Sequence, residues 1–342
     1  MVELNGKKIL VTFLMHLGDL TLTTPFIHAL RKAAPDAHIT MLVDEKLKDV
    51  VLFNPYLDEV VTIDKKGRDN SILSLWACSR HLSKLDFDVL INLHPNERCS
   101  FIDAMTNVKL RTGTTHKIFK WFWDVFTPLD RSMHAADMYL DVLQQLGVQD
   151  LSNNGLEIFP GEEHFLEAEL FWQEQNITDQ DKLIGFNIGS AVPTKRWPPE
   201  RFAEVADIFA AKGYKTVFFG GPMDEEMVAE ATGYMQTRPI IATGHFAIGG
   251  LAAAMRRCCL IITNDSGPMH VAISQKVPIV AMYGPSNPKL YGPYTKDAVI
   301  VTAQPPCQGC ADGMKHSCDD LQCMTRMTVE QVVKAADTML NK

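Results

Sequence analysis

The chain has 342 residues, which is longer than most single hydrophobic cores and predicts two domains. Its hydrophobic fraction of 46% is that of an ordinary globular protein, and its net charge of −8 argues against a general nucleic-acid binder. The first residues lack the ordered regions of a signal peptide, and no apolar run approaches the roughly 20 residues of a membrane span. We therefore expect a cytoplasmic protein, at most peripheral to a membrane.

In the first half of the chain, strand-like apolar runs alternate with helical patterns. The expected strands are 8–13, 38–43, 59–63, 89–93 and the weaker 110–113. Helical patterns lie between them at 20–33, 46–53 and 71–85. This alternation is typical of βαβ units and predicts a parallel sheet.

The second half repeats the alternation. The expected strands are 183–188, 216–219, 240–242, 260–263, 279–283 and 299–302, and the expected helices are 162–174, 199–211, 225–235, 248–256, 268–274 and 328–340. Turn signals at 153–155 and 159–161 place the boundary in the region 153–183. We assign domains 1–160 and 161–342, with the last helix able to pack back on the first domain.

The segment NDSGPMH at 264–270 is the most informative motif. It follows an apolar run and begins a helix with Pro268 near its first position. The open N–H groups and positive dipole end of such a helix suit a diphosphate. Asp265 can cap the turn or hold a ribose hydroxyl, and His270 lies on the first helical turn. The motif predicts a nucleotide-diphosphate site.

Two further strand-to-helix turns carry polar side chains. After strand 8–13, Gly18 permits a tight turn and Asp19 follows it. Two roles fit Asp19, namely a general base or an N-cap of the helix at 20–33, and spacing alone favours the cap. After strand 183–188, a small-residue loop leads to Lys195 and Arg196, where N–H donors and a cation can neutralise a diphosphate. A solvated Lys-Arg pair explains that loop equally well.

Acidic residues begin the helix at 225–235. Asp224 and Glu225 are either ordinary partners of the helix dipole or contacts for a nucleoside sugar or base. The dinucleotide fingerprint G-x-G-x-x-G is missing at every strand-to-helix turn, which argues against a dehydrogenase.

The first domain contains a basic, aromatic neighbourhood on an acidic background. His94 and Arg98 follow strand 89–93, and Lys117 and Lys120 lie in the aromatic segment 117–126. This segment predicts contact with an amphipathic anionic acceptor or a membrane surface. Buried aromatic packing is the more common explanation for such a segment.

Eight cysteines fall into two groups. Those at 78, 99, 258 and 259 lie in apolar or mixed surroundings and are expected to be buried thiols, and a disulfide framework is not expected in a reducing cytoplasm. Cys307, Cys310, Cys318 and Cys323 have the number and crowding of a tetrahedral site for structural zinc or iron, with His316 as a spare ligand. Their spacing matches no common zinc module, so a structural metal stays an open interpretation, and a catalytic metal is not expected.

Together these motifs resemble glycosyltransferase family 9, the heptosyltransferases of lipopolysaccharide core assembly. The matching pieces are MHLGD at 15–19, TKRWP at 194–198, TNDSGPMH at 263–270 and YGPSNP at 283–288. They occur in the same order over nearly the whole chain, and the cysteine cluster with its following helix is similar to the heptosyltransferase II-like branch. The resemblance implies an α/β GT-B fold, in which two Rossmann-like doubly wound parallel-sheet domains face each other across a cleft.

The resemblance also implies an inverting enzyme that transfers heptose from ADP-L-glycero-β-D-manno-heptose to the lipopolysaccharide inner core without a required cofactor. The acceptor then binds the first domain, near His94, Arg98, Lys117 and Lys120, and the donor binds the second. By the same resemblance Asp19 becomes the catalytic base and Lys195 contacts the diphosphate. The implied donor-binding residues are Gly18, Ser190, Thr194, Lys195, Asp224, Glu225, Asp265, Ser266, Gly267 and His270.

Three alternatives remain open. The same fold and donor class can serve another acceptor, such as a protein serine or a different saccharide. A GT-B sugar-nucleotide epimerase would convert the donor without any acceptor. A non-catalytic nucleotide-binding module is disfavoured, because Asp19 and Lys195 are both present. The sequence does not determine which heptose is added, the linkage or the oligomeric state.

Overall fold

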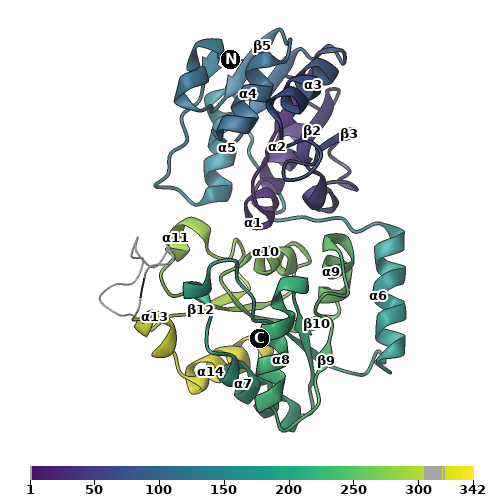
Figure 1. The fold of residues 1–342 in the computed structure, drawn as a ribbon, viewed down its shortest axis with the longest axis vertical. Coiled ribbons are helices and arrows are strands. Elements are labelled where there is room, and N and C mark those ends of the chain that lie inside the picture. The colour runs from purple at the N-terminus through teal and green to yellow at the C-terminus, as the bar shows by residue number, and fades with distance from the viewer. Residues whose placement is uncertain (1, 304–317, 319) are drawn as a thin grey trace. The chain divides into compact units, whose positions relative to one another are not determined.

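The computed structural model describes residues 2–303, 318 and 320–342. The chain forms two compact units, Met1–Phe159 (unit 1) and Pro160–Lys342 (unit 2), shown in Figure 1. The boundary lies one residue before the position assigned from the turn signals. Each unit contains a six-stranded parallel sheet with helices on both faces.

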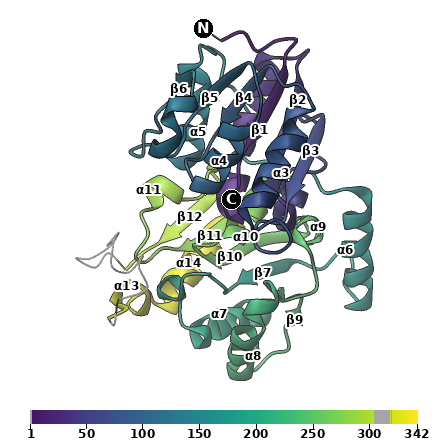
Figure 2. The ribbon, with the colours of Figure 1, turned by 45° about the horizontal axis from the view of Figure 1, so that its top comes forward.

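In unit 1 the sheet order is β3-β2-β1-β4-β5-β6 (Figure 2). Its strands are β1 (Lys8–Thr12), β2 (His38–Asp44), β3 (Glu59–Ile63), β4 (Val89–Asn92), β5 (Leu110–Gly113) and β6 (Val125–Phe126). Four of the five residues of β1 and all four of β4 are buried, as expected for central parallel strands covered on both faces.

The helices of unit 1 cover both faces of this sheet. They are α1 (Leu17–Thr21), α2 (Thr24–Ala33), α3 (Ile72–Ser83), α4 (Glu97–Met105) and α5 (Ala135–Gln145), with 3₁₀ turns η1 (Glu45–Val50) and η2 (Lys117–Phe122). Helix α2 packs against α5, and α3 packs against α4. The core beneath α3 and α4 includes the buried side chains of Leu10, Leu90 and Ile102.

Unit 2 has the same topology, with sheet order β12-β11-β10-β7-β8-β9. Its strands are β7 (Leu183–Asn187), β8 (Lys215–Phe219), β9 (Ile240–Ile241), β10 (Cys258–Asn264), β11 (Ile279–Met282) and β12 (Ala298–Val301). The central pair is β7 and β10, in which Ile262 lies opposite Phe186.

Helices again lie on both faces. They are α6 (Glu162–Glu174), α7 (Pro199–Ala211), α8 (Glu225–Tyr234), α9 (Ile248–Met255), α10 (Gly267–Ser274), α11 (Pro288–Tyr291), α13 (Gln322–Thr325) and α14 (Val329–Leu340), with 3₁₀ turns η3 (Pro193–Lys195) and η4 (Pro222–Asp224). Helix α14, which the sequence left able to pack back on the first domain, packs against α7, β10, β11 and β12 of unit 2.

The predicted helix at 20–33 is confirmed from Thr24 to Ala33, but it is wrong as one continuous helix, because the structure divides it into α1 and α2. Pro25 has no N–H to donate to the carbonyl of Thr21, and its ring would clash with that carbonyl in a continuous helix. The hydroxyl of Thr24 donates to the Thr21 carbonyl instead, at 2.8 Å. Helix α1 therefore ends at Thr21, and α2 begins with Pro25 in its first turn.

Other elements also differ from the prediction. The helix expected at 46–53 is the shorter 3₁₀ turn η1. Helices α4 and α5 were not predicted, and α4 begins where the Asn96 side chain accepts a hydrogen bond from the Cys99 N–H at 2.7 Å.

Each sheet reverses its strand order at its centre, between β1 and β4 in unit 1 and between β7 and β10 in unit 2. In doubly wound sheets, ligands bind beyond the carboxyl ends of the strands at such a switch point. The loops that follow Thr12, Asn92, Asn187 and Asn264 are therefore where each unit presents groups to a ligand.

Gly113, at the end of β5, adopts φ of +90°, and a Cβ there would lie 2.2 Å from the backbone oxygen of Asn92. We expect Gly113→Ala to lower the free energy of unfolding by about 3 kcal/mol or more, because backbone strain and a backbone clash add together. Gly6→Ala is the matched control in unit 1: φ is +69° and nothing lies within 4 Å. Urea unfolding of both variants measures the difference, and equal losses would contradict the role of the clash.

Candidate functional site

In unit 2, two asparagine side chains join the ends of the central strands. Asn187 Nδ2 donates to Thr263 Oγ1 at 3.1 Å and to Ser266 Oγ at 2.8 Å. Asn264 Nδ2 donates to the Ile188 carbonyl at 2.7 Å, and its Oδ1 accepts from the Trp197 N–H at 3.0 Å. These bonds hold the loop after β7 against the loop after β10.

Helix α10 begins at this junction with an open N-terminus. Ser266 occupies the N-cap position, but within the described part of the chain its hydroxyl makes no cap bond and accepts from Asn187 instead. No acidic residue lies in the first turn. The first N–H groups of α10 and its positive dipole end thus remain suited to an anion.

Lys195 and Asp265 form an ion pair at this helix end. Lys195 Nζ lies 2.7 Å from Asp265 Oδ2, and their side chains are only 14% and 6% exposed. Ser286 Oγ donates to the same carboxylate oxygen at 2.5 Å. The sequence left capping or ribose binding open for Asp265, and the structure adds a third role, which is to hold the ammonium of Lys195 in place.

The other residues of these loops lie close to the pair. Ser190 Oγ donates to the Asp265 carbonyl at 3.3 Å, and Arg196 Nε donates to the Ser190 carbonyl at 2.8 Å. Thr194 is buried in η3, and His270 is buried within α10. The structure therefore gathers most of the predicted donor-binding residues of this domain around the N-terminus of α10.

The two candidate acids after β8 differ in their surroundings. Asp224 is buried and accepts from the Gly221 N–H at 2.9 Å, and a Cβ on Gly189 would lie 2.1 Å from its Oδ1. Its carboxylate thus packs beneath the loop after β7. Glu225 is exposed beside Gly244, so it is the acid of the two that solvent or a ligand reaches.

In unit 1, Asp19 lies in the first turn of α1, and His16 occupies the N-cap position. The interpretation of Asp19 as the N-cap is therefore wrong. Gly18 lies beside it in the same turn, and the Asp19 side chain is half-buried. The preceding loop is held by Lys65, whose Nζ donates to the carbonyls of Leu14 and Met15, each at 3.0 Å.

Lys65 was not identified from the sequence. It also pairs with Asp44 at 3.0 Å. A pocket of about 490 Å³ adjoins it, lined by Leu14, Met15, Lys65, Asn96, Glu97, Arg98 and His116. The Arg98 guanidinium is held there by two hydrogen bonds. It donates to the Lys65 carbonyl, and its Nη2 donates to Asn70 Oδ1 at 2.7 Å. The role of Lys65 depends on the tertiary contact between the segment after β3 and the loop after β1.

The remaining predicted acceptor residues do not line this pocket. Burial, followed by the positive charges of Arg131 and other neighbours, lowers the pKa of His94 to about 4, so its imidazole is neutral at pH 7. Its ring packs edge-on against Phe13. Lys117 and Lys120 are exposed on η2 beside Trp121, which is 95% exposed. The interpretation of this segment as buried aromatic packing is therefore wrong for Trp121.

A fully buried carboxylate lies beneath the switch point of unit 1. Asp103 Oδ2 accepts from Thr12 Oγ1 at 2.9 Å and from Asn92 Nδ2 at 2.6 Å, which are the last residues of β1 and β4. Asn92 Oδ1 in turn accepts from the His94 N–H at 2.7 Å. Burial raises the pKa of Asp103 to about 7. Asp103 therefore ties the two strand ends together from below.

The predicted metal cluster lies largely outside the described residues, which include Cys318 and Cys323 but not Cys307, Cys310 or His316. Cys323 packs in the core of unit 2, and Cys318 Sγ donates to the Asp320 carbonyl at 3.1 Å. Within the described ranges, no group of three or more His, Cys, Asp or Glu side chains has a metal-binding arrangement.

Comparisons with known proteins agree with this architecture. The family profile "Glycosyltransferase family 9 (heptosyltransferase)" matches residues 75–318. A crystal structure of a glycosyl transferase family 9 protein from Veillonella parvula DSM 2008 has 54% sequence identity and a TM-score of 0.95, and the match covers 99% of each chain.

Two more distant proteins are also similar over most of their lengths. Lipopolysaccharide heptosyltransferase 3 of Escherichia coli (strain K12) is 24% identical over 297 residues, which cover 82% of this chain and 84% of that protein. The structure of E. coli ADP-heptose LPS heptosyltransferase II has a TM-score of 0.81 at 21% identity, covering 98% of each chain. The predicted fold class, two Rossmann-like parallel-sheet domains of the GT-B type, is confirmed.

The raised pKa of the buried Asp103 makes the free energy of unfolding depend on pH. Its pKa of about 7 exceeds the unfolded value of about 3.9, so the folded protein binds more protons between these limits. The stability from this group is complete below pH 4 and is lost as the pH rises to 7. We expect Asp103→Asn to gain stability relative to the wild type across that range, by at most about 1.4 kcal/mol per pH unit.

Urea unfolding at intervals of one pH unit measures this gain. Asp49→Asn, which removes another carboxylate of unit 1, serves as the control and should follow the wild-type curve. Parallel curves for Asp103→Asn and the wild type would contradict the prediction.

Proposed function

Because the chain belongs to glycosyltransferase family 9, whose profile matches more than half of it, we propose that it transfers heptose from ADP-L-glycero-β-D-manno-heptose to the inner core of lipopolysaccharide, with inversion at the anomeric carbon. The observation that carries the proposal is the Lys195–Asp265 pair at the open N-terminus of α10. Donor and acceptor identity are supported by the names of similar proteins, an ADP-heptose LPS heptosyltransferase and a lipopolysaccharide heptosyltransferase.

The donor diphosphate binds at the N-terminus of α10 in this proposal. The first N–H groups of the helix meet the phosphate oxygens, and Lys195 supplies the nearest fixed positive charge. Asp265 and Ser286 keep the ammonium in place before the donor arrives, so little reorganisation is needed when charge grows on the leaving group. Glu225, the exposed acid after β8, serves the ribose or adenine end.

No metal is required by this chemistry. As the bond from the anomeric carbon to the diphosphate oxygen breaks, both electrons of that bond go to the departing ADP. Fixed N–H dipoles and Lys195 stabilise the developing charge, which is the role that a divalent cation has in other transferases. Transfer should therefore persist in EDTA.

Asp19 acts as the general base. It takes the proton from the acceptor hydroxyl as that oxygen attacks the anomeric carbon from the face opposite ADP, which inverts the configuration. The loop that leads to Asp19 is held through its backbone carbonyls by Lys65, and this restrains the position of α1.

The pocket beside Lys65, Arg98 and His116 receives the anionic part of the saccharide acceptor. Its guanidinium, from Arg98, suits carboxylate or phosphate groups and is already oriented by its bonds to the Lys65 carbonyl and Asn70. The acceptor carries a lipid, and η2 provides a surface for it.

The exposed side chains of Ile118, Trp121 and Phe122 lie on η2 beside Lys117 and Lys120, which is the composition of an interfacial membrane contact. No helix within the described residues is long and apolar enough to cross a membrane. A peripheral contact with the inner membrane follows as part of the proposal.

The proposal is tested by mass spectrometry with ADP-heptose and truncated, heptose-deficient lipopolysaccharide cores in EDTA. A mass gain of one heptose is expected. Donor conversion without acceptor would indicate an epimerase instead, and ADP-heptose binding without transfer would indicate another acceptor, such as a protein serine. Absence of ADP-heptose binding would overturn the donor assignment.

We expect Asp19→Ala to retain ADP affinity in calorimetry but to lose transfer by about 10²–10⁴-fold, because only the base is removed. Asp49→Ala removes another half-buried carboxylate of unit 1 and should retain wild-type turnover. Turnover of Asp19→Ala within a few-fold of the wild type would rule out Asp19 as the base.

Lys195→Ala should weaken ADP binding by about 10–100-fold and reduce kcat further, since a charge-assisted contact is lost and Asp265 is left buried without its partner. In the double variant Lys195→Ala/Asp265→Asn, the buried charge is gone. Thermal stability should recover while turnover stays low. Recovery of turnover as well would mean that Lys195 only neutralises Asp265.

A further inference from the structure

Helix α3 carries large apolar side chains on its solvent-exposed side. Ile72 and Leu73, in its first turn, are 67% and 75% exposed, and Trp76 is 49% exposed. Helix α4 packs against α3, beside which it lies in Figure 2, and also against η2, where Trp121 is exposed. The connections from β3 to β4, β4 to β5 and β5 to β6 run in one direction across the sheet, so right-handed crossovers place all three elements on one face.

The pocket that the proposed function assigns to the acceptor lies between α3 and η2. Arg98, which lines it, donates through Nη2 to Asn70 Oδ1 at 2.7 Å, and α3 begins two residues after Asn70. His116 also lines the pocket and occupies the N-cap position of η2. Exposed apolar side chains therefore follow directly on two borders of the pocket.

Both borders are basic, on a chain that is acidic. Residues 70–85 and 104–123 contain no Asp or Glu, although the net charge of the chain is −8. Arg80 and Lys84 are exposed at the end of α3, and η2 contributes two lysines. Apolar side chains among cations are complementary to the headgroups and acyl boundary of an anionic bilayer.

Three acids lie at the edges of this face. Asp69, before α3, pairs with Arg68 at 3.1 Å, and Glu97 of α4 lies 3.9 Å from His116 Nε2. Glu97 is exposed, so solvent screens its charge. Asp86 follows the far end of α3, about 18 Å along the helix from its first turn. The face that contains the pocket therefore keeps an excess of positive charge.

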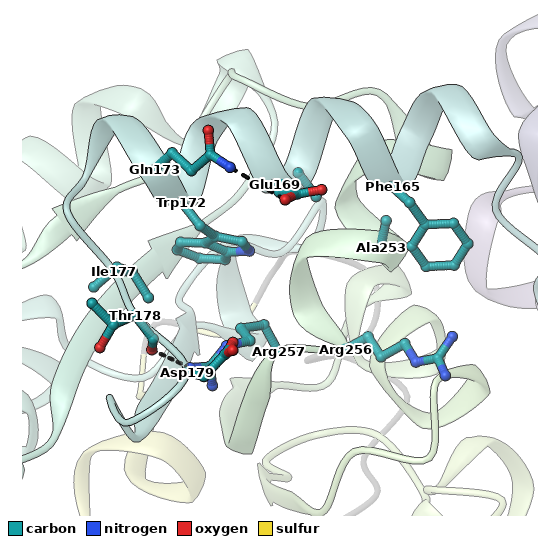
Figure 3. A pocket seen from close by; sticks show the side chains of 11 residues that line it. Phe165, Glu169, Trp172, Gln173, Ile177, Thr178, Asp179, Ala253, Arg256 and Arg257 are labelled. Atoms are coloured by element: carbon teal, nitrogen blue, oxygen red, sulfur yellow. Dashed lines mark hydrogen bonds between the residues drawn. The ribbon is translucent and has the colours of Figure 1, made fainter.

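Helix α6 shows that exposed leucines alone do not indicate a membrane contact. It exposes Leu166 and Leu170, at 57% and 51%, but it contains no Lys or Arg. Glu162 and Glu169 are exposed on the same helix, and Figure 3 shows Glu169 beside Gln173, whose amide donates to it at 3.2 Å. An anionic bilayer repels such a helix, so α6 provides the matched control for α3.

We propose that α3 and η2 together form a bilayer-binding face and that the pocket between them lies at the surface of an anionic membrane. Ile72, Leu73 and Trp76 enter the headgroup region on one border of the pocket, and the apolar side chains of η2 enter it on the other. This inference deepens the proposed function and rests on it for the acceptor. A lipid-borne saccharide reaches Arg98 while its lipid stays in the bilayer.

Sedimentation of the full chain with vesicles, without donor or acceptor, tests the proposal. Vesicles of phosphatidylglycerol and phosphatidylethanolamine should bind the protein at least about 10-fold more strongly than vesicles of phosphatidylcholine. Ile72→Ser/Leu73→Ser should lower binding to the anionic vesicles by about 10-fold, because two apolar side chains no longer enter the bilayer. Leu166→Ser/Leu170→Ser removes a matched pair on α6 and should bind as the wild type does.

A melting temperature confirms that each double variant is folded. Failure of the wild type to sediment with the anionic vesicles, or equal sedimentation of the two double variants, would overturn the proposal. A dimer that forms without vesicles and is abolished by Ile72→Ser/Leu73→Ser would assign the face to a second copy of the chain, and would overturn it as well.

Transfer assays separate this inference from the proposed function. In Ile72→Ser/Leu73→Ser, transfer to an acceptor embedded in vesicles should fall about 10-fold, and transfer to the water-soluble, deacylated core should not change, because neither residue lines the pocket. Equal losses with both acceptors would refute the membrane role of α3. Vesicle binding by a wild-type protein that transfers no heptose would contradict the proposed function and support the bilayer-binding face.

Discussion

The ion pair between Lys195 and Asp265 is the contact on which the proposed chemistry of unit 2 depends. It joins the loop after β7 to the loop after β10, and it is largely shielded from water. Removing one partner would leave a buried charge, so neither residue is independent of the other. Helix α10 has no acidic residue in its first turn, so its first N–H groups keep their positive dipole end beside this pair.

Unit 1 has the same topology but different polar groups at its switch point. At its switch point a buried Asp103 joins the ends of β1 and β4 from below, and Lys65 holds the following loop through two carbonyls. The polar groups in unit 1 thus hold the backbone that leads to Asp19, whereas those in unit 2 surround the N-terminus of α10, where we propose that the donor diphosphate binds. Under the proposed function, the two copies of this topology bind two substrates of different chemistry.

The sequence predictions succeeded and failed for identifiable reasons. Most strands were located because central parallel strands are continuous apolar runs bounded by turn residues. The helix expected at 20–33 is interrupted after Thr21, because Pro25 has no N–H for the carbonyl of Thr21, four residues earlier. Helix α4 was missed because its apolar positions are interrupted by Asp103, an acid that the fold buries.

The sequence by itself determined the order of βαβ units, the turns that carry Asp19, Lys195 and Asp265, and the likeness to a glycosyltransferase family. These are local properties of periodicity, glycine and proline. Tertiary structure alone decided that Lys195 meets Asp265, 70 residues away, and that Lys65 holds a loop about 50 residues before it. These long-range contacts depend on which strands become neighbours in each sheet. The strand order is set by long-range pairing and not by any local sequence pattern.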